Sequence, residues 1–87
     1  MRELCQQIAP AYDALHCNVP LYSAKKRLIT EVDVLGVRGN KQDAFEVKCS
    51  LRLVKAKHQL RKARKALNIR HTFLYCGESG SLIPIEE

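Results

Sequence analysis

The chain has 87 residues, which suffices for a single domain spanning residues 1–87 and leaves no room for a second. Its hydrophobic share of 46% and charged share of 28% exclude an intrinsically disordered chain. No apolar run approaches the about 20 residues of a membrane span, and the N-terminal residues lack the apolar stretch of a signal peptide, so we expect an intracellular, cytoplasmic protein without a membrane partner. The net charge of +6 favours a polyanionic partner such as nucleic acid.

The N-terminal part of the chain predicts a helix and then a short strand. Apolar residues recur at helical spacing over residues 3–16, and Pro10 inside this helix kinks it or divides it into two short turns. Residues 18–24 predict a short strand, which Pro20 confines to a sheet edge or to a strand start.

Two stronger strands follow and predict an antiparallel hairpin. Residues 27–39 are rich in β-branched side chains, which suit a pleated strand surface, and residues 43–49 alternate apolar and charged positions. Gly39 and Asn40 tolerate positive φ and predict the turn between these strands.

The C-terminal part predicts a long helix and two further strands. Leucine and alanine recur every three or four residues over residues 51–67, which is the clearest helical pattern in the chain. Residues 71–77 predict a buried strand, and residues 82–85 predict a final edge strand. The chain therefore predicts an α/β domain with a mixed central sheet flanked by helices, in the order α-β-β-β-α-β-β.

Four cysteines, at positions 5, 17, 49 and 76, show no C-x-x-C spacing of a zinc or redox site. We expect buried, reduced thiols, because free cysteine is among the most buried residue types. A disulfide is the alternative interpretation.

Basic residues concentrate in two places. Seven of the fifteen lysines and arginines fall between residues 52 and 65, where no acidic residue occurs, and three more form the run at 25–27. A helix face that only confers solubility usually mixes charges of both signs, because like charges repel at helical spacing. We therefore favour a nucleic-acid contact over a solvated face. The candidate phosphate contacts are Lys25, Lys26, Arg27, Arg52, Lys55 and Lys62.

Charged side chains interrupt the two hairpin strands at spacings that predict a cluster. Strand alternation places Glu31 and Asp33 on one face of the first strand, while the valines on either side of Asp33 share the other face. The same alternation places Glu46 and Lys48 on one face of the second strand. If the apolar faces coincide in the hairpin, Asp33, Glu46 and Lys48 converge, with Glu31 near them. An exposed sheet face with ordinary salt bridges is the alternative.

Two carboxylates with a neighbouring ammonium form a unit suited to the hydrolysis of phosphate esters. Mg²⁺ binds oxygen ligands, usually one or two carboxylates together with water and substrate phosphate. Such a metal stabilises charge on the scissile phosphate and lowers the pKa of a bound water. An adjacent lysine such as Lys48 can orient or deprotonate that water and stabilise the transition state. Asp33 and Glu46 are therefore candidate ligands of Mg²⁺ or Mn²⁺.

The pattern D…E-x-K on adjacent strands, followed by a helix, resembles the PD-(D/E)xK nuclease superfamily. Asp33 matches the first acid, Glu46 and Lys48 match E-x-K, and the resemblance covers nearly the whole chain. The resemblance implies a restriction-endonuclease-like core. The compact size is most similar to the archaeal Holliday-junction resolvases and to other small DNA-repair or viral nucleases.

The resemblance also implies roles for further residues. It implies that the backbone carbonyl of Val47 is a metal ligand and that Gln59 supports the site. It implies an extra carboxylate from the first helix, for which Glu3 is the candidate and Glu31 the alternative. Val32 stands where a proline often precedes the motif aspartate in this superfamily.

The activity implied by the resemblance is that of a Mg²⁺-dependent endodeoxyribonuclease that selects branched or junction DNA in repair or recombination. A symmetric homodimer would suit junction DNA, because two active sites can cut two symmetry-related strands. The alternatives are a non-catalytic nucleic-acid-binding module that uses the basic helix 52–65, or an RNA-directed nuclease with the same site.

Overall fold

The computed structural model describes residues 2–49 and 53–85. In chain order the elements are α1 (Arg2–Ile8), the 3-10 turn η1 (Ala9–Ala11), β1 (Ala14–Tyr22), β2 (Leu28–Arg38), β3 (Lys41–Lys48), α2 (Leu53–Ala66), β4 (His71–Cys76) and β5 (Ser81–Ile85). The predicted order of helices and strands and the mixed α/β class are confirmed. No helix in the described ranges is long and apolar enough to cross a membrane.

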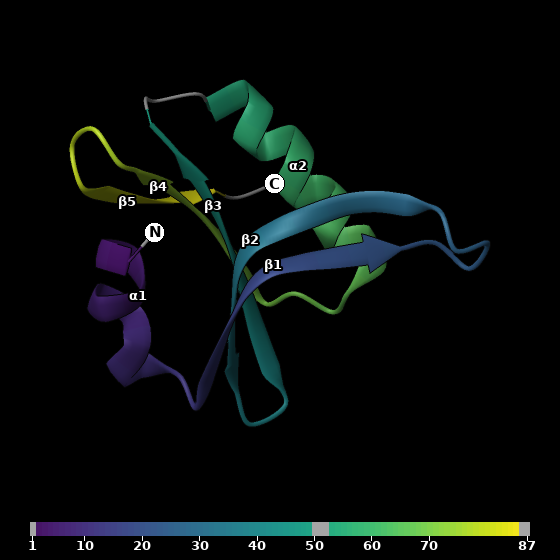
Figure 1. Ribbon diagram of the computed structural model, residues 1–87, viewed down its shortest axis with the longest axis horizontal. Coiled ribbons are helices and arrows are strands. Elements are labelled where there is room, and N and C mark those ends of the chain that lie inside the picture. Colours follow the sequence, from purple (N-terminus) through teal and green to yellow (C-terminus); the bar gives the residue numbers. More distant parts are fainter. Residues whose placement is uncertain (1, 50–52, 86–87) are drawn as a thin grey trace.

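The five strands form one sheet in the order β1-β2-β3-β4-β5 (Figure 1). All neighbouring strands are antiparallel except β3 and β4, which run parallel because α2 connects them as a crossover. The turn between β2 and β3 contains Gly39, whose φ of 60° favours glycine. Pro20 and Pro84 lie in the two edge strands, where a missing N–H is tolerated. The predicted hairpin and mixed sheet are therefore confirmed.

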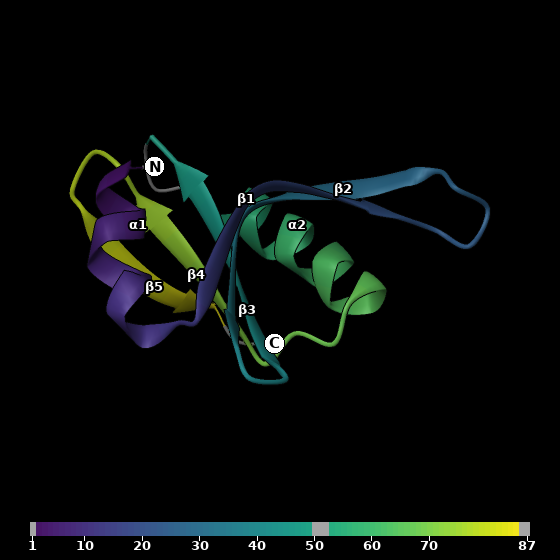
Figure 2. The same cartoon turned by 60° about the horizontal axis from the view of Figure 1, so that its bottom comes forward.

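The two helices cover opposite faces of the sheet, so that the sheet separates two hydrophobic cores (Figure 2). The α2 core contains Leu21, Val32, Leu35, Ala44, Ala56, Leu60, Ala63, Ile69, Leu74 and Ile85. The α1 core contains Leu4, Ile8, Val34, Phe45 and Tyr75. The apolar stripe of α2 predicted from the leucine and alanine spacing therefore faces the sheet, as amphipathic helices do.

Strands β1 and β2 together form an arm that leaves the rest of the sheet (Figures 1 and 2). β2 pairs with β3 only from Val34 onward, whereas its earlier residues pair with β1 alone. Val32 packs in the α2 core and Val34 in the α1 core, so the strand changes faces at Asp33. At the same level of β1, Asn18 has a φ of 53° and is skipped in the pairing. The prediction that the two valines share a face is therefore wrong, because alternation holds only where a strand stays regular.

The predicted N-terminal helix over residues 3–16 is wrong in its second half. Helix α1 ends at Ile8, the following turn contains Pro10, and β1 already begins at Ala14. Proline lacks the N–H that would continue a helix, and pairing with β2 then overrides the helical spacing of the apolar residues. The strand expected at 18–24 consequently starts earlier than predicted.

The four cysteines differ in exposure, and none forms a disulfide. Cys76 is buried and Cys5 is half-buried, whereas Cys17 and Cys49 are exposed. The predicted burial is therefore confirmed for Cys76 alone. Cys49 is exposed because it follows the last residue of β3 and lies outside the sheet.

Candidate active site

Asp33 lies at the fork where β2 separates from β3. Its Oδ2 accepts a hydrogen bond from the backbone N–H of Val47 at 2.8 Å. The β2–β3 ladder stops at Val34 and Phe45, so the N–H of Val47 has no backbone acceptor on β2. The Asp33 carboxylate accepts this N–H instead. The fork, rather than regular alternation, directs the side chain of Asp33 onto β3.

Glu46 and Lys48 lie two residues apart on β3 and face α2, as does Ala44 of the α2 core. Glu46 is only 4% exposed. The Nζ of Lys48 lies 3.5 Å from Oε1 of Glu46, and the side chain of Lys48 is 21% exposed. Backbone pairing with β4 fixes this part of β3, and the hydrogen bond from the N–H of Val47 holds the Asp33 carboxylate beside Glu46 and Lys48.

The protonation of Glu46 depends on this neighbourhood. Burial, together with hydrogen bonding to and repulsion by Asp33, raises the pKa of Glu46 to about 7, although the Lys48 ammonium opposes the shift. The two neighbouring carboxyl groups thus have one ammonium beside them, that of Lys48, which pairs with Glu46. Such a pair favours a cation.

Gln59 belongs to the part of α2 that covers the sheet. It precedes Leu60 of the α2 core and is half-buried. Its Oε1 is buried and has no hydrogen-bond partner among the residues described. A buried acceptor of this kind needs a donor, which suits the supporting role implied by the resemblance.

The two candidates for an extra carboxylate occupy different places. Glu3 of α1 lines a pocket of about 410 Å³ together with Val47 and Lys48, and its Oε2 accepts a long hydrogen bond from the hydroxyl of Tyr75 at 3.4 Å. Glu31 is exposed on the arm, on the far side of the fork from β3. Within the described ranges, no three His, Cys, Asp or Glu side chains lie close enough together to hold a metal ion. The structure therefore brings neither Glu3 nor Glu31 into the carboxylate pair.

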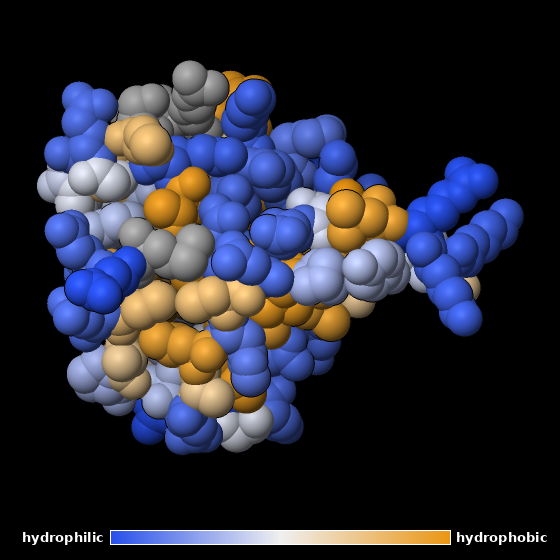
Figure 3. Space-filling model, viewed as in Figure 1, coloured by the Kyte–Doolittle hydropathy of each residue, from blue (hydrophilic) through white to orange (hydrophobic). Residues whose placement is uncertain are grey.

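The predicted phosphate contacts fall on two exposed surfaces. Lys25, Lys26 and Arg27 are exposed at the tip of the arm, which Figure 3 shows as a hydrophilic projection from the body of the protein. Lys55 and Lys62 are exposed on α2 and, being seven residues apart, lie on the same side of it. Arg52 lies outside the described residues.

A second charged cluster was not predicted from the sequence. Asp43 at the start of β3 is 2% exposed and accepts hydrogen bonds from Arg70, from the backbone N–H of His71 and from the hydroxyl of Tyr12. Burial acts to raise the pKa of Asp43, but the hydrogen bonds from Arg70 and Tyr12 outweigh it and lower the pKa. An aspartate in an apolar strand is the only signal in the sequence, because its partners lie about 30 residues away on either side.

Comparison with protein-family models and with curated proteins finds no match for this chain. The chemistry of the fork at Asp33 is therefore the main guide to function.

Proposed function

We propose that the protein is a metal-dependent endonuclease of PD-(D/E)xK type that hydrolyses DNA phosphodiester bonds, with a restriction-endonuclease-like core and its active site at the β2–β3 fork. The observation that carries this proposal is the contact between the carboxyl groups of Asp33 and Glu46, beside the ammonium of Lys48. The three residues come from adjacent strands and match the motif in order and spacing. Their convergence is what the chemistry of phosphodiester hydrolysis requires.

The donor set fits a hard divalent cation. Mg²⁺ and Mn²⁺ take one or two carboxylates and complete their coordination with water and substrate phosphate, so the pair formed by Asp33 and Glu46 is sufficient. Burial and the neighbouring Asp33 raise the pKa of Glu46, and a bound cation would lower it. The backbone carbonyl of Val47 would be a further ligand. When bound, the metal would supply positive charge at the scissile phosphate and acidify the attacking water.

Lys48 would hold the attacking water and stabilise the negative charge that develops on the phosphate. Its ion pair with Glu46 orients the ammonium, and its partial exposure leaves it accessible to substrate. Glu3 would act across the adjoining pocket, and Gln59 would support the site from α2.

Backbone phosphates of the substrate would contact the tip of the arm and the exposed side of α2. Such contacts position a substrate but carry no sequence information, so we expect selection of DNA structure, such as a branch or junction. A symmetric dimer would then place two active sites on two strands. This activity belongs to DNA repair or recombination.

A cleavage assay tests the proposal. The protein is incubated with branched, duplex and single-stranded DNA and with RNA, in Mg²⁺ and in EDTA. We expect Mg²⁺-dependent nicking of DNA that falls by roughly 100-fold or more in Glu46→Gln and Lys48→Ala. The matched control is Glu78→Gln, which removes an exposed carboxylate from the β4–β5 turn and should leave nicking unchanged.

Three outcomes would contradict the proposal in different ways. Equal nicking by Lys48→Ala, or no Mg²⁺-dependent nicking of any substrate, would reject the nuclease. Tight binding without cleavage would indicate a non-catalytic binding module. Cleavage of RNA alone would retain the site but change the substrate.

A further inference from the structure

The end of the β2–β3 hairpin places two like charges opposite each other. Arg38 and Lys41 are direct partners in the antiparallel ladder, and both are exposed. Like charges in this position destabilise a sheet, whereas an acid at either position would stabilise it. Neither cation takes part in an ion pair within residues 2–49 and 53–85. The hairpin therefore retains an unfavourable charge pair, which is the kind of local conflict expected at a binding site.

A third cation, Arg70, is oriented by a buried partner. Its Nε and Nη2 donate to the two carboxylate oxygens of Asp43 at 3.1 and 2.9 Å. Asp43 is itself fixed by Tyr12 and by the backbone N–H of His71. A guanidinium has five N–H donors, so these two bonds leave three for another oxyanion. Because Arg70 is held before a ligand arrives, it loses little conformational freedom on binding.

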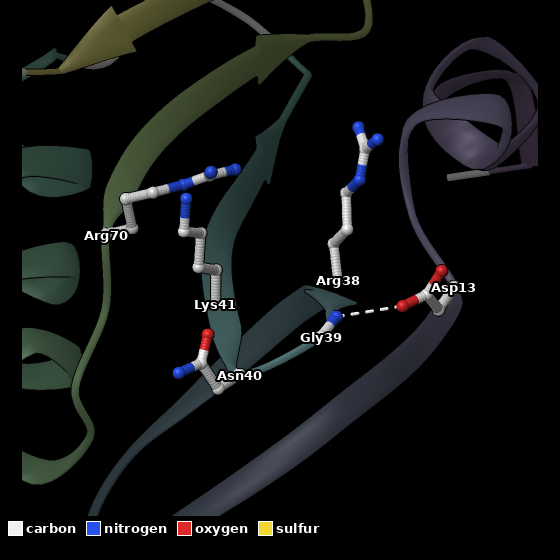
Figure 4. Close-up of a pocket in the computed structure, with 6 residues that line it drawn as sticks. All are labelled: Asp13, Arg38, Gly39, Asn40, Lys41 and Arg70. Atoms are coloured by element: carbon white, nitrogen blue, oxygen red, sulfur yellow. Dashed lines mark hydrogen bonds between the residues drawn. The ribbon is translucent and has the colours of Figure 1, made fainter.

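The three cations line one pocket of about 580 Å³ at this end of the sheet (Figure 4). Its lining residues are Asp13, Arg38, Gly39, Asn40, Lys41 and Arg70. Figure 4 shows Arg38 and Lys41 extending to the same side of the hairpin, with Arg70 entering from the start of β4. Asp13 is the one carboxylate in the lining, and its Oδ2 already accepts the backbone N–H of Gly39 at 2.8 Å. The lining thus offers the cations of Arg38 and Lys41, the remaining N–H donors of Arg70 and few free acceptors.

We propose that this basic pocket binds a phosphate group, and that the phosphate belongs to a nucleic-acid backbone. Arginine and lysine recognise phosphate oxygens through short, charge-assisted hydrogen bonds. The N–H donors of arginine lie in one plane and can bind two oxygens of a phosphate at once. The choice of a nucleic-acid backbone rests on the proposed function. The affinity of the pocket for phosphate rests only on the residues that line it.

The basic pocket lies far from the proposed active site. Lys41 begins β3 and Lys48 ends it, which separates their Cα atoms by about 23 Å. Lys41 also shares its strand face with Phe45 of the α1 core, whereas Glu46 and Lys48 face α2. A branched DNA has duplex branches that diverge, so it can present one phosphate to the active site and another to the basic pocket. The pocket would therefore hold the substrate at a second point, on the DNA branch that is not cut.

The pocket is tested with inorganic phosphate as the probe and chloride at equal ionic strength as the reference. The test variant is Arg38→Gln/Lys41→Gln, and the charge-matched control is Lys57→Gln/Lys65→Gln, which removes two exposed lysines that are not among the candidate phosphate contacts. We expect phosphate to raise the thermal midpoint of the wild type, the control and Glu46→Gln, by roughly 8 °C at ten times its dissociation constant. The test variant should show no such rise. In chloride it should melt no lower than the wild type, because it loses a like-charge pair.

A second measurement identifies the source of the phosphate. Binding of a branched DNA is measured over a range of salt concentrations, and the slope of log K against log salt for the test variant should be smaller by about 1.8, as expected for two lost phosphate contacts. Loss of the phosphate response with an unchanged slope would overturn the nucleic-acid source and leave free phosphate as the ligand. A test variant that responds to phosphate as the wild type does would overturn the pocket. The phosphate response does not depend on Glu46, so it can be measured whether or not the protein cleaves DNA. If the wild type does not nick DNA, the proposed function is rejected and the phosphate-binding pocket is unaffected.

Discussion

At the level of single residues, the folded protein places two acids in opposite chemical states. Glu46 is buried beside another carboxyl group, which raises its pKa to about 7. Asp43 is buried too, but Arg70, the Tyr12 hydroxyl and the His71 N–H donate hydrogen bonds to it and lower its pKa. Both residues are less than 5% exposed, so burial alone does not decide whether the pKa of a carboxyl group rises or falls. The partner decides it, and the two residues should therefore respond differently to substitution.

Glu46→Gln should change how stability depends on pH. The folded protein holds the Glu46 proton more tightly than the unfolded chain, whose carboxyl titrates near 4.5, so this contribution to stability is complete below pH 4.5 and is lost as pH rises through 7. The loss amounts to about 3 kcal/mol at most. Urea denaturation from pH 4 to pH 8 should show a smaller decline for Glu46→Gln than for the wild type. Glu78→Gln should follow the wild type, and parallel curves for all three proteins would exclude the raised pKa.

Asp43→Ala should destabilise the protein strongly. The substitution leaves Arg70, Tyr12 and the backbone N–H of His71 without their common acceptor. We expect a loss of about 3 kcal/mol in the free energy of unfolding, because the Tyr12 hydroxyl and the His71 N–H lose their acceptor inside the protein, whereas the exposed guanidinium of Arg70 can turn to water. Tyr12→Phe removes a single donor and should cost about 1 kcal/mol. Chemical denaturation measures both values, and equal losses would show that Asp43 depends on Tyr12 alone.

At the level of the elements, the two halves of β2 have different neighbours within the one sheet. Its second half belongs to the five-stranded sheet, whereas its first half pairs only with β1 in the arm. In the second half, Gly36 gives room for the ring of Tyr12, which packs against the strand at this point. The contact joins the connection between α1 and β1 to the middle of the sheet.

Gly36→Ala should therefore destabilise the sheet. A Cβ at this position would lie 2.9 Å from Cδ1 and Cε1 of Tyr12, so the ring that also donates to Asp43 would have to move. We expect a loss of about 1–3 kcal/mol, seen as a lower thermal midpoint. Gly77→Ala is the matched control, because its Cβ would approach no atom closer than 3.5 Å. If both variants melted with the wild type, the packing of Tyr12 on Gly36 would be contradicted.

The elements with strong local patterns could be predicted from the sequence. The leucine and alanine spacing of α2, the β-branched run of β2 and the Gly39 turn each determine local structure by themselves. The apolar spacing before Leu15 could not be interpreted correctly, because pairing with β2 converts that segment to a strand. Long-range pairing of this kind leaves no local signal.

The candidate active site was also predictable only where local pattern determines the structure. Glu46 and Lys48 share a regular strand, so alternation places them correctly. Asp33 reaches them through an irregularity in β2 that alternation cannot predict. The basic pocket was missed because Arg70 lies about 30 residues from its hairpin partners, although an arginine and a lysine flanking a Gly-Asn turn are visible in the sequence.

At the level of the whole molecule, groups of two or more exposed basic residues lie in three separate places within the described residues. They lie at the tip of the arm, along α2, and in the pocket at the end of the β2–β3 hairpin. The tip is held by its own backbone, because the N–H of Ser23 bonds to the carbonyl of Arg27 at 2.8 Å and the N–H of Lys26 bonds to the carbonyl of Ser23 at 2.9 Å. Its charges are therefore available for a ligand and are not needed for the turn.

Neutralising the tip should weaken DNA binding without unfolding the protein. The triple variant Lys25→Gln/Lys26→Gln/Arg27→Gln should reduce the slope of log K against log salt by about 2.7, if each residue neutralises one phosphate. Its thermal midpoint should match that of the wild type. Ser23→Ala removes the hydroxyl that accepts the N–H of Arg27 at 3.2 Å but no charge, so its slope should stay unchanged. A wild-type slope for the triple variant would exclude the arm from the interface.

The change of faces in β2 has a consequence for how rigidly the proposed site is held. Asp33 lies between Val32 and Val34, which are 2% and 0% exposed in two different cores. A shift of the chain that moved the Asp33 carboxylate along β3 would draw one of these valines into water, at a cost of about 1.5–3 kcal/mol. The two valines therefore anchor the acid from both sides of the sheet. The precision of a polar site is thus determined by apolar side chains that lie outside it.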